Sequence, residues 1–502
     1  MQVERTRITI KPNPKRVLFR PIHIDEQDRI YKIIARVMML SESQVHQELK
    51  KIKKEFEGRH PHYLEDLESR YKHFKNYVFT DTLISQERKW LVAAHFSQEY
   101  TPEAAALFNP SMVWHPDQNG VPEQSRRFIL SLRATGESHI SSITFRTGII
   151  DAQGQIKLDT PSSFVTNPDP IPNSSYEKSL FEKKLYELGV HNDYTQKLMQ
   201  KLPEYFTYEQ LERVLESESK QRSLYSDMDR ETFINSILSL AQSNYEIDFH
   251  SHEDLSERAI FPSTEAEIKG LEDARFVEFI DSDLSRTFYA TYTAYDGNII
   301  LPQLLETKDF KHFKINTLNG PAVQYKGFAL FPRKIDGRYA ILSNQDKENI
   351  YLMFSDYVHF WHDKTLLARP RGSWESLQIG NCGSPIETSE GWLVLTYGMG
   401  PMRRVAMGAM LLDRDDPLKI IGRLDEPLLK PTHTEREGYV PNVLFSCGAQ
   451  VHHDYLIIPY SIADSACSFA RIKLSALIDK LLKREKKPQK TQIHPKKQTR
   501  TP

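Results

Sequence analysis

The densest group of chemically capable side chains in this sequence is the segment GLEDARFVEF at residues 270–279. Glu272, Asp273 and Arg275 follow a turn glycine and lead into an apolar run that reads as a strand. A carboxylate beside a fixed arginine is held in one orientation, and its pKa is then set by local burial and charge. Such a group can act as a general acid, but a turn salt bridge uses the same residue types, and this segment alone favours the salt bridge.

Polar side chains interrupt several other apolar segments in the same way. None of these segments is distinctive alone, but together they supply one or two polar groups per strand-rich unit. A polyhydroxylated ligand in a central pocket would require such a set. The set includes Asn109, Arg133, Lys326, Asn344, Tyr397, Glu435, Glu437 and Asp464.

The other candidate sites are weak. His250 and His252 in DFHSHED have flanking acids, but H-x-H with acids is typical of a hydrated loop, so we predict no metal site. Cys382 has no assignable histidine partner, and we expect it to be a buried structural thiol. The sequence has no GxSxG, HExxH or phosphate-loop motif, and we expect no cofactor.

Composition narrows the class of protein. The chain has 502 residues, a net charge of −1 and 11% aromatic residues, which suits a large packed core and excludes disorder for most of its length. Near-neutral charge argues against a nucleic-acid or membrane-surface binder. The charged start lacks the apolar run of a signal peptide, and no stretch approaches the ~18 apolar residues of a membrane span. We therefore expect a cytoplasmic protein.

A repeat organises the strand-rich regions. Its copies each consist of a turn and an aromatic-led apolar strand: RRFILSLRA (126–134), SRTFYATYTAYDG (285–297), GRYAILSNQD (337–346), EGWLVLTYGMG (390–400) and HDYLIIPYSIAD (453–464). Short strands that recur about every 50 residues are typical of propeller blades. The fold class predicted is mainly β, a five-bladed β-propeller; a β-sandwich is the alternative, but it does not need regular spacing.

Helical patterns interrupt this arrangement. Residues 1–100 are predicted to be a helical N-terminal extension, and residues 101–473 a propeller with a helical insert at about 170–245. Residues 474–502 read as a basic, disordered tail, since nine Lys or Arg face one acid between Lys480 and Arg500. We expect the helical additions to pack on the propeller rim, where they either mediate self-association or cover the pocket.

Six motifs occur in the order found in glycoside hydrolase family 130, the mannoside phosphorylases and β-mannosidases. The resemblance covers roughly residues 104–473 and rests on the order of the motifs, because none is diagnostic alone. It agrees with the repeat, since the family's fold is a five-bladed β-propeller. The motifs are FNPSMV, GLEDARFVEF, KGFALFPRKIDGRYAILS, CGSPIETSEGWLVLTYG, EREGYVPNVLFSCGA and IPYSIADS.

The resemblance implies cleavage of a β-mannoside with inversion, by phosphate in most members and by water in some. The family's acid is the Asp of its G-x-E-D-x-R motif, here Asp273, which protonates the leaving oxygen through a mannosyl hydroxyl. A phosphorylase needs no second carboxylate base, but it needs a basic pocket for phosphate. The resemblance places mannosyl contacts at Asn109, Arg133 and Asp464, and we add Glu272 and Arg275 to the expected substrate-binding residues.

The phosphate pocket departs from the family pattern. Lys326 matches a basic family residue, but Asn344 stands where the family has Arg, and Tyr397 where it has His. Weakened anion binding would have to be restored by an arginine, and Arg403 is our candidate, with Arg333, Arg338 and Arg404 as others.

Three functions stay open. The first is a phosphorylase that uses inorganic phosphate as co-substrate and releases mannose 1-phosphate. The second is a β-mannosidase with Glu435 or Glu437 as general base. The third is an inactive glycan-binding propeller, suggested by the changes at Asn344 and Tyr397. The expected partners are a β-mannoside oligosaccharide and phosphate, with no nucleic acid and no membrane.

Overall fold

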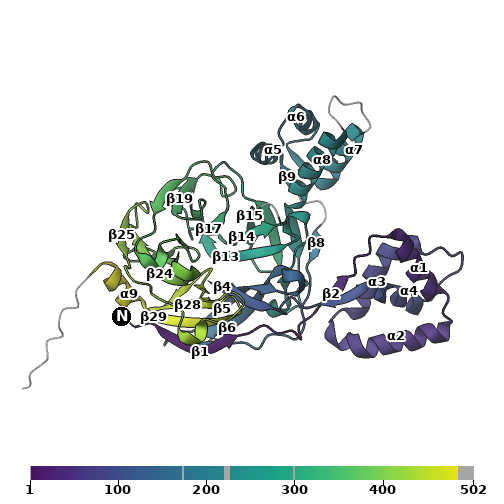
Figure 1. Ribbon diagram of the computed structural model, residues 1–502, viewed down its shortest axis with the longest axis horizontal. Coiled ribbons are helices and arrows are strands. Elements are labelled where there is room, and N and C mark those ends of the chain that lie inside the picture. The colour runs from purple at the N-terminus through teal and green to yellow at the C-terminus, as the bar shows by residue number, and fades with distance from the viewer. Residues whose placement is uncertain (1, 172–174, 220–226, 298–299, 484–502) are drawn as a thin grey trace, which may run out of the picture.

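The structure of the protein is a computed structural model that describes residues 2–171, 175–219, 227–297 and 300–483. It is mainly β, as predicted. Figure 1 shows a rounded body of strands with two groups of helices, α1–α4 and α5–α8, that project from it at separate places. Within the described residues, no helix is both long and apolar enough to cross a membrane.

The body contains five antiparallel runs of strands that follow one another along the chain. The first run is β4 (Ala106–Trp114), β5 (Arg126–Thr135), β6 (Ser141–Ile150) and β7 (Ile156–Leu158). The second is β13 (Gly270–Ile280), β14 (Arg286–Tyr295), β15 (Ile300–Thr307) and β16 (His312–Thr317). The third is β17 (Lys326–Leu330), β18 (Tyr339–Asn344), β19 (Ile350–Ser355) and β20 (Thr365–Ala368).

The last two runs begin with a divided first strand. In the fourth run, β21 (Gln378–Asn381) and β22 (Ile386–Thr388) both pair with β23 (Gly391–Met399), which continues to β24 (Val405–Leu412) and β25 (Ile420–Arg423). In the fifth, β26 (Leu444–Phe445) and β27 (Gln450–His452) pair with β28 (Tyr455–Ile462), which is followed by β29 (Ala466–Lys473). Each of the five sequence repeats falls on the second strand of a run: β5, β14, β18, β23 and β28.

Short strands connect and extend the runs. A single parallel pair, Gly270 with Ser141, joins the first run to the second. The outer edge of the second run continues beyond β16 into β11 (Tyr245–Asp248) and β8 (Asp169–Ile171), and β12 (Ala259–Ile260) pairs with β6. The segments that enter and leave the helical insert therefore belong to the strand body.

The N-terminus corrects one sequence prediction. Residues 1–100 were expected to be a helical extension, but β1 (Glu4–Ile10) pairs antiparallel with β29 and completes the fifth run. The strand ERTRITI has only two strongly apolar residues and lies at a sheet edge, so its own pattern predicts it poorly. The helices of this region are consequently inserted between β1 and β4.

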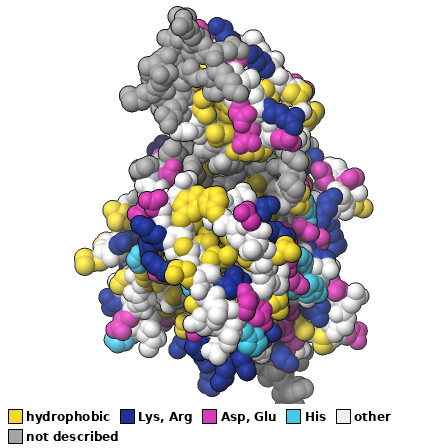
Figure 2. Space-filling model, turned by 90° about the vertical axis from the view of Figure 1, so that its right-hand side faces the viewer, with side chains coloured by type: hydrophobic (Ala, Val, Ile, Leu, Met, Phe, Trp, Pro, Cys, Tyr) yellow, Lys and Arg dark blue, Asp and Glu magenta, His cyan; other side chains and the backbone are white. Residues whose placement is uncertain are grey.

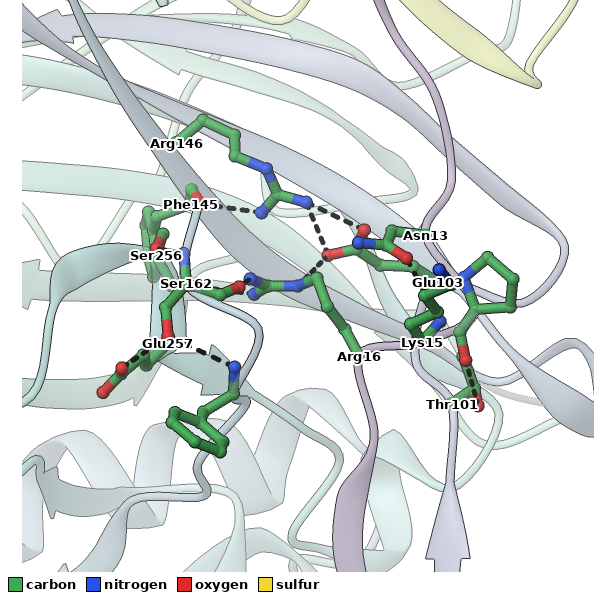
Figure 3. Close-up of polar contacts among 12 residues, drawn as sticks. Asn13, Lys15, Arg16, Thr101, Glu103, Phe145, Arg146, Ser162, Ser256 and Glu257 are labelled. Carbon is green, nitrogen blue, oxygen red and sulfur yellow. Dashed lines mark hydrogen bonds and ion pairs between the residues drawn. The ribbon is translucent and has the colours of Figure 1, made fainter. Parts of the chain in front are cut away.

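A buried ion cluster holds the chain where it leaves β1 for the helices. Glu103 accepts from Arg16 Nε at 3.1 Å and from Arg146 Nη2 at 2.7 Å. The Nη atoms of Arg16 donate to the backbone oxygens of Ser162 and Ser256 (Figure 3). Because Arg16 and Glu103 are fully buried, the segments that they join are fixed to one another.

The first helical group stands on a two-stranded stem, β2 (Leu18–Pro21) paired with β3 (Ser97–Tyr100). Its helices are α1 (Gln27–Met38), α2 (Glu42–Phe56), α3 (Tyr63–Phe74) and α4 (Gln86–Ala94). Ser41 caps α2 in a capping box with Gln44, and the apolar faces form a small core around Ile34, Val45 and Leu91. Figure 2 shows that basic and acidic side chains are interspersed on the face that carries this group.

The second helical group has its own core. It contains β9 (Ser175–Glu177), α5 (Lys178–Glu187), α6 (Asp193–Gln200), β10 (Tyr205–Thr207), α7 (Tyr208–Ser219) and α8 (Asp227–Gln242). Phe181, Leu198 and Phe206 lie at its centre. The helices lie within the range predicted for the insert.

The C-terminus corrects a second prediction. The tail was expected to be disordered from residue 474, but Leu474–Leu481 form helix α9, which buries Leu477, Ile478 and Leu481 against the strand body. These apolar residues at helical spacing outweigh the basic composition of the segment. The remainder of the predicted tail, residues 484–502, lies outside the described residues.

Candidate active site

The predicted site residues gather at one end of the strand runs. Asn109, Asp273 and Lys326 lie near the starts of the first strands β4, β13 and β17. Arg133 lies near the end of the second strand β5, and Asp464 lies in the turn between β28 and β29. Because the strands in each run are antiparallel, starts of first strands and ends of second strands share one end of the body.

Three of these first strands carry a bulge at the site. The pairing register shifts between Phe108 and Ser111, between Glu272 and Arg275, and between Lys326 and Ala329, and each shift inserts one extra residue. Asn109 and Asp273 take left-handed backbone angles there, with φ of 48° and 56°. Asn and Asp tolerate this region better than other non-glycine residues, and a bulge redirects a side chain out of the alternating pattern.

Asp273 is held by neutral and cationic donors at once. Its Oδ1 accepts from Asn109 Nδ2 at 2.5 Å and from Arg133 Nη1 at 3.3 Å. Its Oδ2 makes no hydrogen bond to the described residues. The carboxylate is therefore oriented by one oxygen, and the other is available to a ligand.

Glu272 lies between two cations of the site, Arg133 and Lys326. It accepts from Arg133 Nη2 at 2.8 Å, and its second oxygen lies 3.8 Å from Lys326 Nζ. The side chains of Arg133 and Lys326 are 19% and 34% exposed, so both cations can be reached by an anion from solvent.

The two aspartates of the site have opposite electrostatics. Burial raises the pKa of Asp273, but Arg133, Lys326, Arg275 and the Asn109 amide more than offset it, and the pKa is lowered to about 2. Burial and the charge of Asp273 raise the pKa of Asp464 to about 7, against the opposing effect of the cations. Near neutral pH, Asp273 is therefore ionised, whereas Asp464 binds a proton more readily than an ordinary aspartate.

Arg275 is a buried residue that contacts the backbone of the site. It is buried, donates to the backbone oxygen of Asp273 at 3.1 Å, and lies 5.8 Å from the ring of Phe445. This arrangement stabilises the strained backbone at Asp273 and adds positive charge. Direct contact with substrate, as predicted for Arg275, would require access to a buried side chain.

The predicted phosphate residues differ in what they can offer. Asn344 Nδ2 donates to the backbone oxygens of Asn349 and Ile379 at 2.9 and 2.6 Å, so both of its N–H groups are already used. Tyr397 Oη accepts from Gln378 Nε2 at 2.8 Å, which leaves its own proton for an anion. Tyr397 is thus the better placed of the two neutral replacements.

The candidate arginines are also distinguished. Arg403, in the 3-10 turn Pro401–Arg403, is exposed and close enough to lower the pKa of Asp464. Arg333 is instead paired with Glu387 at 2.7 Å, and Arg338 lies over the ring of Phe354. Of these three arginines, Arg403 is the one whose charge acts on the site.

Glu435 is occupied structurally. Its oxygens accept from Tyr460 Oη at 2.8 Å, Arg5 Nε at 3.0 Å and Thr432 Oγ1 at 2.8 Å. It therefore anchors β1 to the loop before β26. Glu437, the other predicted base, is exposed.

Sequence reasoning missed several supporting residues. Ser461 Oγ lies 3.3 Å from Asn109 Oδ1, and Gln378 fixes Tyr397. His139 Nδ1 lies 2.7 Å from Tyr439 Oη. The available signal was Asn and Asp inside apolar strands, where these residues are depleted, and this marks the bulges but not their partners.

The histidines considered for a metal lie at the base of the first helical group. His62 Nε2 is 3.4 Å from His252 Nε2, and the ring of His250 stacks on that of His252. Within the described part of the chain, no three His, Cys, Asp or Glu side chains are arranged to hold a metal ion. The three cysteines are buried and unpaired.

The chain is similar in sequence to known mannoside phosphorylases. The model of glycoside hydrolase family 130, described as β-1,4-mannooligosaccharide phosphorylase, matches residues 224–483, just over half of the chain. A 1,2-β-oligomannan phosphorylase of Thermoanaerobacter sp. (strain X514) is 34% identical over 219 residues, 42% of this chain and 71% of the relative. A β-1,2-mannobiose phosphorylase of Listeria innocua is 31% identical over 44% of this chain and 63% of its own.

Solved structures include the Listeria innocua β-1,2-mannobiose phosphorylase in complex with β-1,2-mannobiose. It covers 75% of this chain and 92% of its own, at 23% identity and a TM-score of 0.46. The assignment to a family rests on the sequence matches. On the strength of the family model and the oligomannan phosphorylase relative, the chain belongs to glycoside hydrolase family 130.

Proposed function

We propose that this protein is an inverting β-mannoside phosphorylase that releases mannose 1-phosphate. The observation that carries the proposal is the pair of reachable cations, Arg133 and Lys326, beside the oriented carboxylate of Asp273. Anion binding and acid catalysis need these groups side by side. The sequence relatives named as mannoside phosphorylases support the same reaction.

In this proposal, Asn109, Glu272 and Asp464 bind the mannosyl ring, and Arg133 lies where it can contact both the ring and the phosphate. Lys326, Tyr397 and Arg403 hold phosphate, with its oxygen on the face of C1 opposite the leaving group. The glycosidic C1–O bond breaks as the C1–O bond to phosphate forms, which inverts the β-linkage to α-mannose 1-phosphate. The proton of Asp273 passes through a mannosyl hydroxyl to the leaving oxygen.

The test is direct. Purified full-length protein is incubated with β-1,2-, β-1,3- and β-1,4-mannobiose, each with and without inorganic phosphate, and mannose and mannose 1-phosphate are measured. We expect mannose 1-phosphate only when phosphate is present, and the three substrates assign the linkage. Cleavage at the same rate without phosphate would refute phosphorolysis.

Hydrolysis is the second candidate function, and an inverting hydrolase needs a general base. Glu435 accepts hydrogen bonds from Arg5, Thr432 and Tyr460 and is therefore not free to act as the general base, which argues against hydrolysis. An inactive glycan-binding protein is the third candidate. The intact contacts of Asp273 with Asn109 and Arg133 argue against it, and turnover of any mannobiose would exclude it.

We further propose that the five runs form a five-bladed propeller over residues 101–473, closed by β1, and that the first helical group mediates self-association. This group exposes Met39, Phe79 and Leu83. A chain that starts near Phe96 would also lose β1, so a cleaner test deletes residues 22–95 and joins the stem. A deletion variant with unchanged oligomeric state would refute the role in self-association.

A further inference from the structure

The contacts of Asp273 within the protein favour its ionised form over its acid form. Its Oδ1 accepts two hydrogen bonds, one from an amide and one from a guanidinium, and the positive charge of the guanidinium favours the ionised carboxylate. A general acid must nevertheless be protonated when the leaving group departs. Binding of a substrate must therefore change the protonation state of the Asp273 carboxyl group.

The cations that hold Asp273 ionised are also the cations that an anion would use. Arg133 contacts both Asp273 and Glu272, and Lys326 lies beside Glu272. Both side chains are partly exposed, in contrast to the buried Arg275. A bound dianion would compete with the two acids for Arg133 and Lys326.

We propose that phosphate binding causes protonation of the general acid. When phosphate takes the contacts of Arg133 and Lys326, Asp273 binds a proton, and without phosphate Asp273 stays ionised. This inference rests on the proposed function and adds a control to it. Because Asp273 is protonated only when phosphate is bound, a mannoside that binds without phosphate lies beside an ionised carboxylate. That mannoside is therefore not hydrolysed.

The charges around Asp273 give the sign of the effect. A dianion adds negative charge beside a carboxyl group and neutralises the cations that stabilised its ionised form, so the pKa of Asp273 rises. Oδ2, which makes no hydrogen bond to the described residues, is the oxygen that can take the proton. The titratable and charged groups that act on this region are Arg133, Glu272, Arg275, Tyr325, Lys326, Cys382, Tyr397, Arg403, Cys447 and Asp464.

Sulfate is a suitable probe, since it stays dianionic across the working pH range and any net proton uptake then comes from the protein. Its binding to the full-length protein is measured by calorimetry in buffers of different ionisation enthalpy at about pH 5. Asp464, with a pKa of about 7, is already protonated there and does not contribute, and the Asp273→Asn variant distinguishes uptake by Asp273 from uptake by Glu272. We expect a net uptake of up to one proton per bound sulfate.

Variants separate the contributions. Asp273→Asn should bind sulfate without uptake, while Asp464→Asn should keep the uptake at this pH. Lys326→Gln should weaken sulfate binding, whereas Lys334→Gln, a matched change at a lysine paired with Asp281, should not. Sulfate binding without proton uptake by the unaltered protein would overturn the inference and leave phosphorolysis standing. Absence of both sulfate binding and phosphorolysis would refute the proposed function itself.

Discussion

Two of the clusters that combine carboxylates with arginine or lysine differ in how completely their hydrogen bonds are used. In the first, which we call the Glu103 cluster, Glu103 lies between Arg16 and Arg146 (Figure 3). Arg16 and Glu103 are fully buried and Arg146 is 6% exposed. Burial lowers the pKa of Arg16 to about 10, with Arg146 adding to the effect and Glu103 opposing it.

The second, the Asp273 cluster, is left open. Arg133, Glu272 and Lys326 are each about a fifth to a third exposed, and Arg133 Nε has no hydrogen-bond partner among the described residues. Asp464 likewise makes no ion pair with any residue that the structure describes. Similar residue types therefore stabilise a fold when their hydrogen bonds are satisfied internally and can bind a ligand when some are left unused.

The largest effect is expected from breaking the open cluster at its centre. Asp273→Asn keeps the shape but removes the acid, and we expect kcat for phosphorolysis to fall about a thousandfold or more. Steady-state release of mannose 1-phosphate measures this. Asp281→Asn, a matched change at an aspartate paired with Lys334, should retain activity. Equal losses in both variants would contradict the assignment of Asp273.

Breaking the closed cluster should instead reduce stability. Glu103→Gln leaves Arg16 and Arg146 buried without a counter-charge, and we expect the free energy of unfolding to fall by about 3–5 kcal/mol. Denaturant unfolding measures this loss. Glu48→Gln removes an exposed partner of Lys51 and should cost at most about 1 kcal/mol. If both variants lose the same stability, the Glu103 cluster is not the anchor that its burial indicates.

A smaller effect separates anion binding from chemistry in the open cluster. Lys326→Gln removes a charge-assisted contact, so KM for phosphate should rise about ten- to a hundredfold with a lesser change in kcat. Lys334→Gln serves as the control and should leave KM for phosphate unchanged. A loss confined to kcat would show that Lys326 acts on the acid and not on phosphate.

The last effect concerns how the stability of the folded protein depends on pH through Asp464. The pKa of Asp464 is raised from about 4 to about 7, so the folded protein binds more protons than the unfolded chain between these values and becomes less stable as pH rises through them. Asp464→Asn removes this loss. We expect the variant to gain melting temperature over the unaltered protein above about pH 7, with the gain fading toward about pH 4. A gain that does not depend on pH would contradict the assignment.

Local patterns predicted much of the fold. The aromatic-led repeats marked β5, β14, β18, β23 and β28, since alternation and turn residues are read within one strand and its neighbours. The positions of both helical groups followed from apolar spacing for the same reason. β1 and α9 were missed, because β1 has little apolar pattern and the basic residues of the tail obscured the helix.

By itself the sequence determined which residues could do chemistry and the order in which the strands deliver them. Asn109, Asp273 and Asp464 were identifiable because they lie in motifs whose order resembles that of glycoside hydrolase family 130. Only the tertiary structure decided which polar groups are already used in hydrogen bonds within the protein. Glu435 is committed to Arg5, 430 residues away, and Asn344 to backbone oxygens, whereas Asp273 keeps one oxygen for a ligand. Hydrogen-bond satisfaction depends on contacts between distant segments, and no local pattern encodes it.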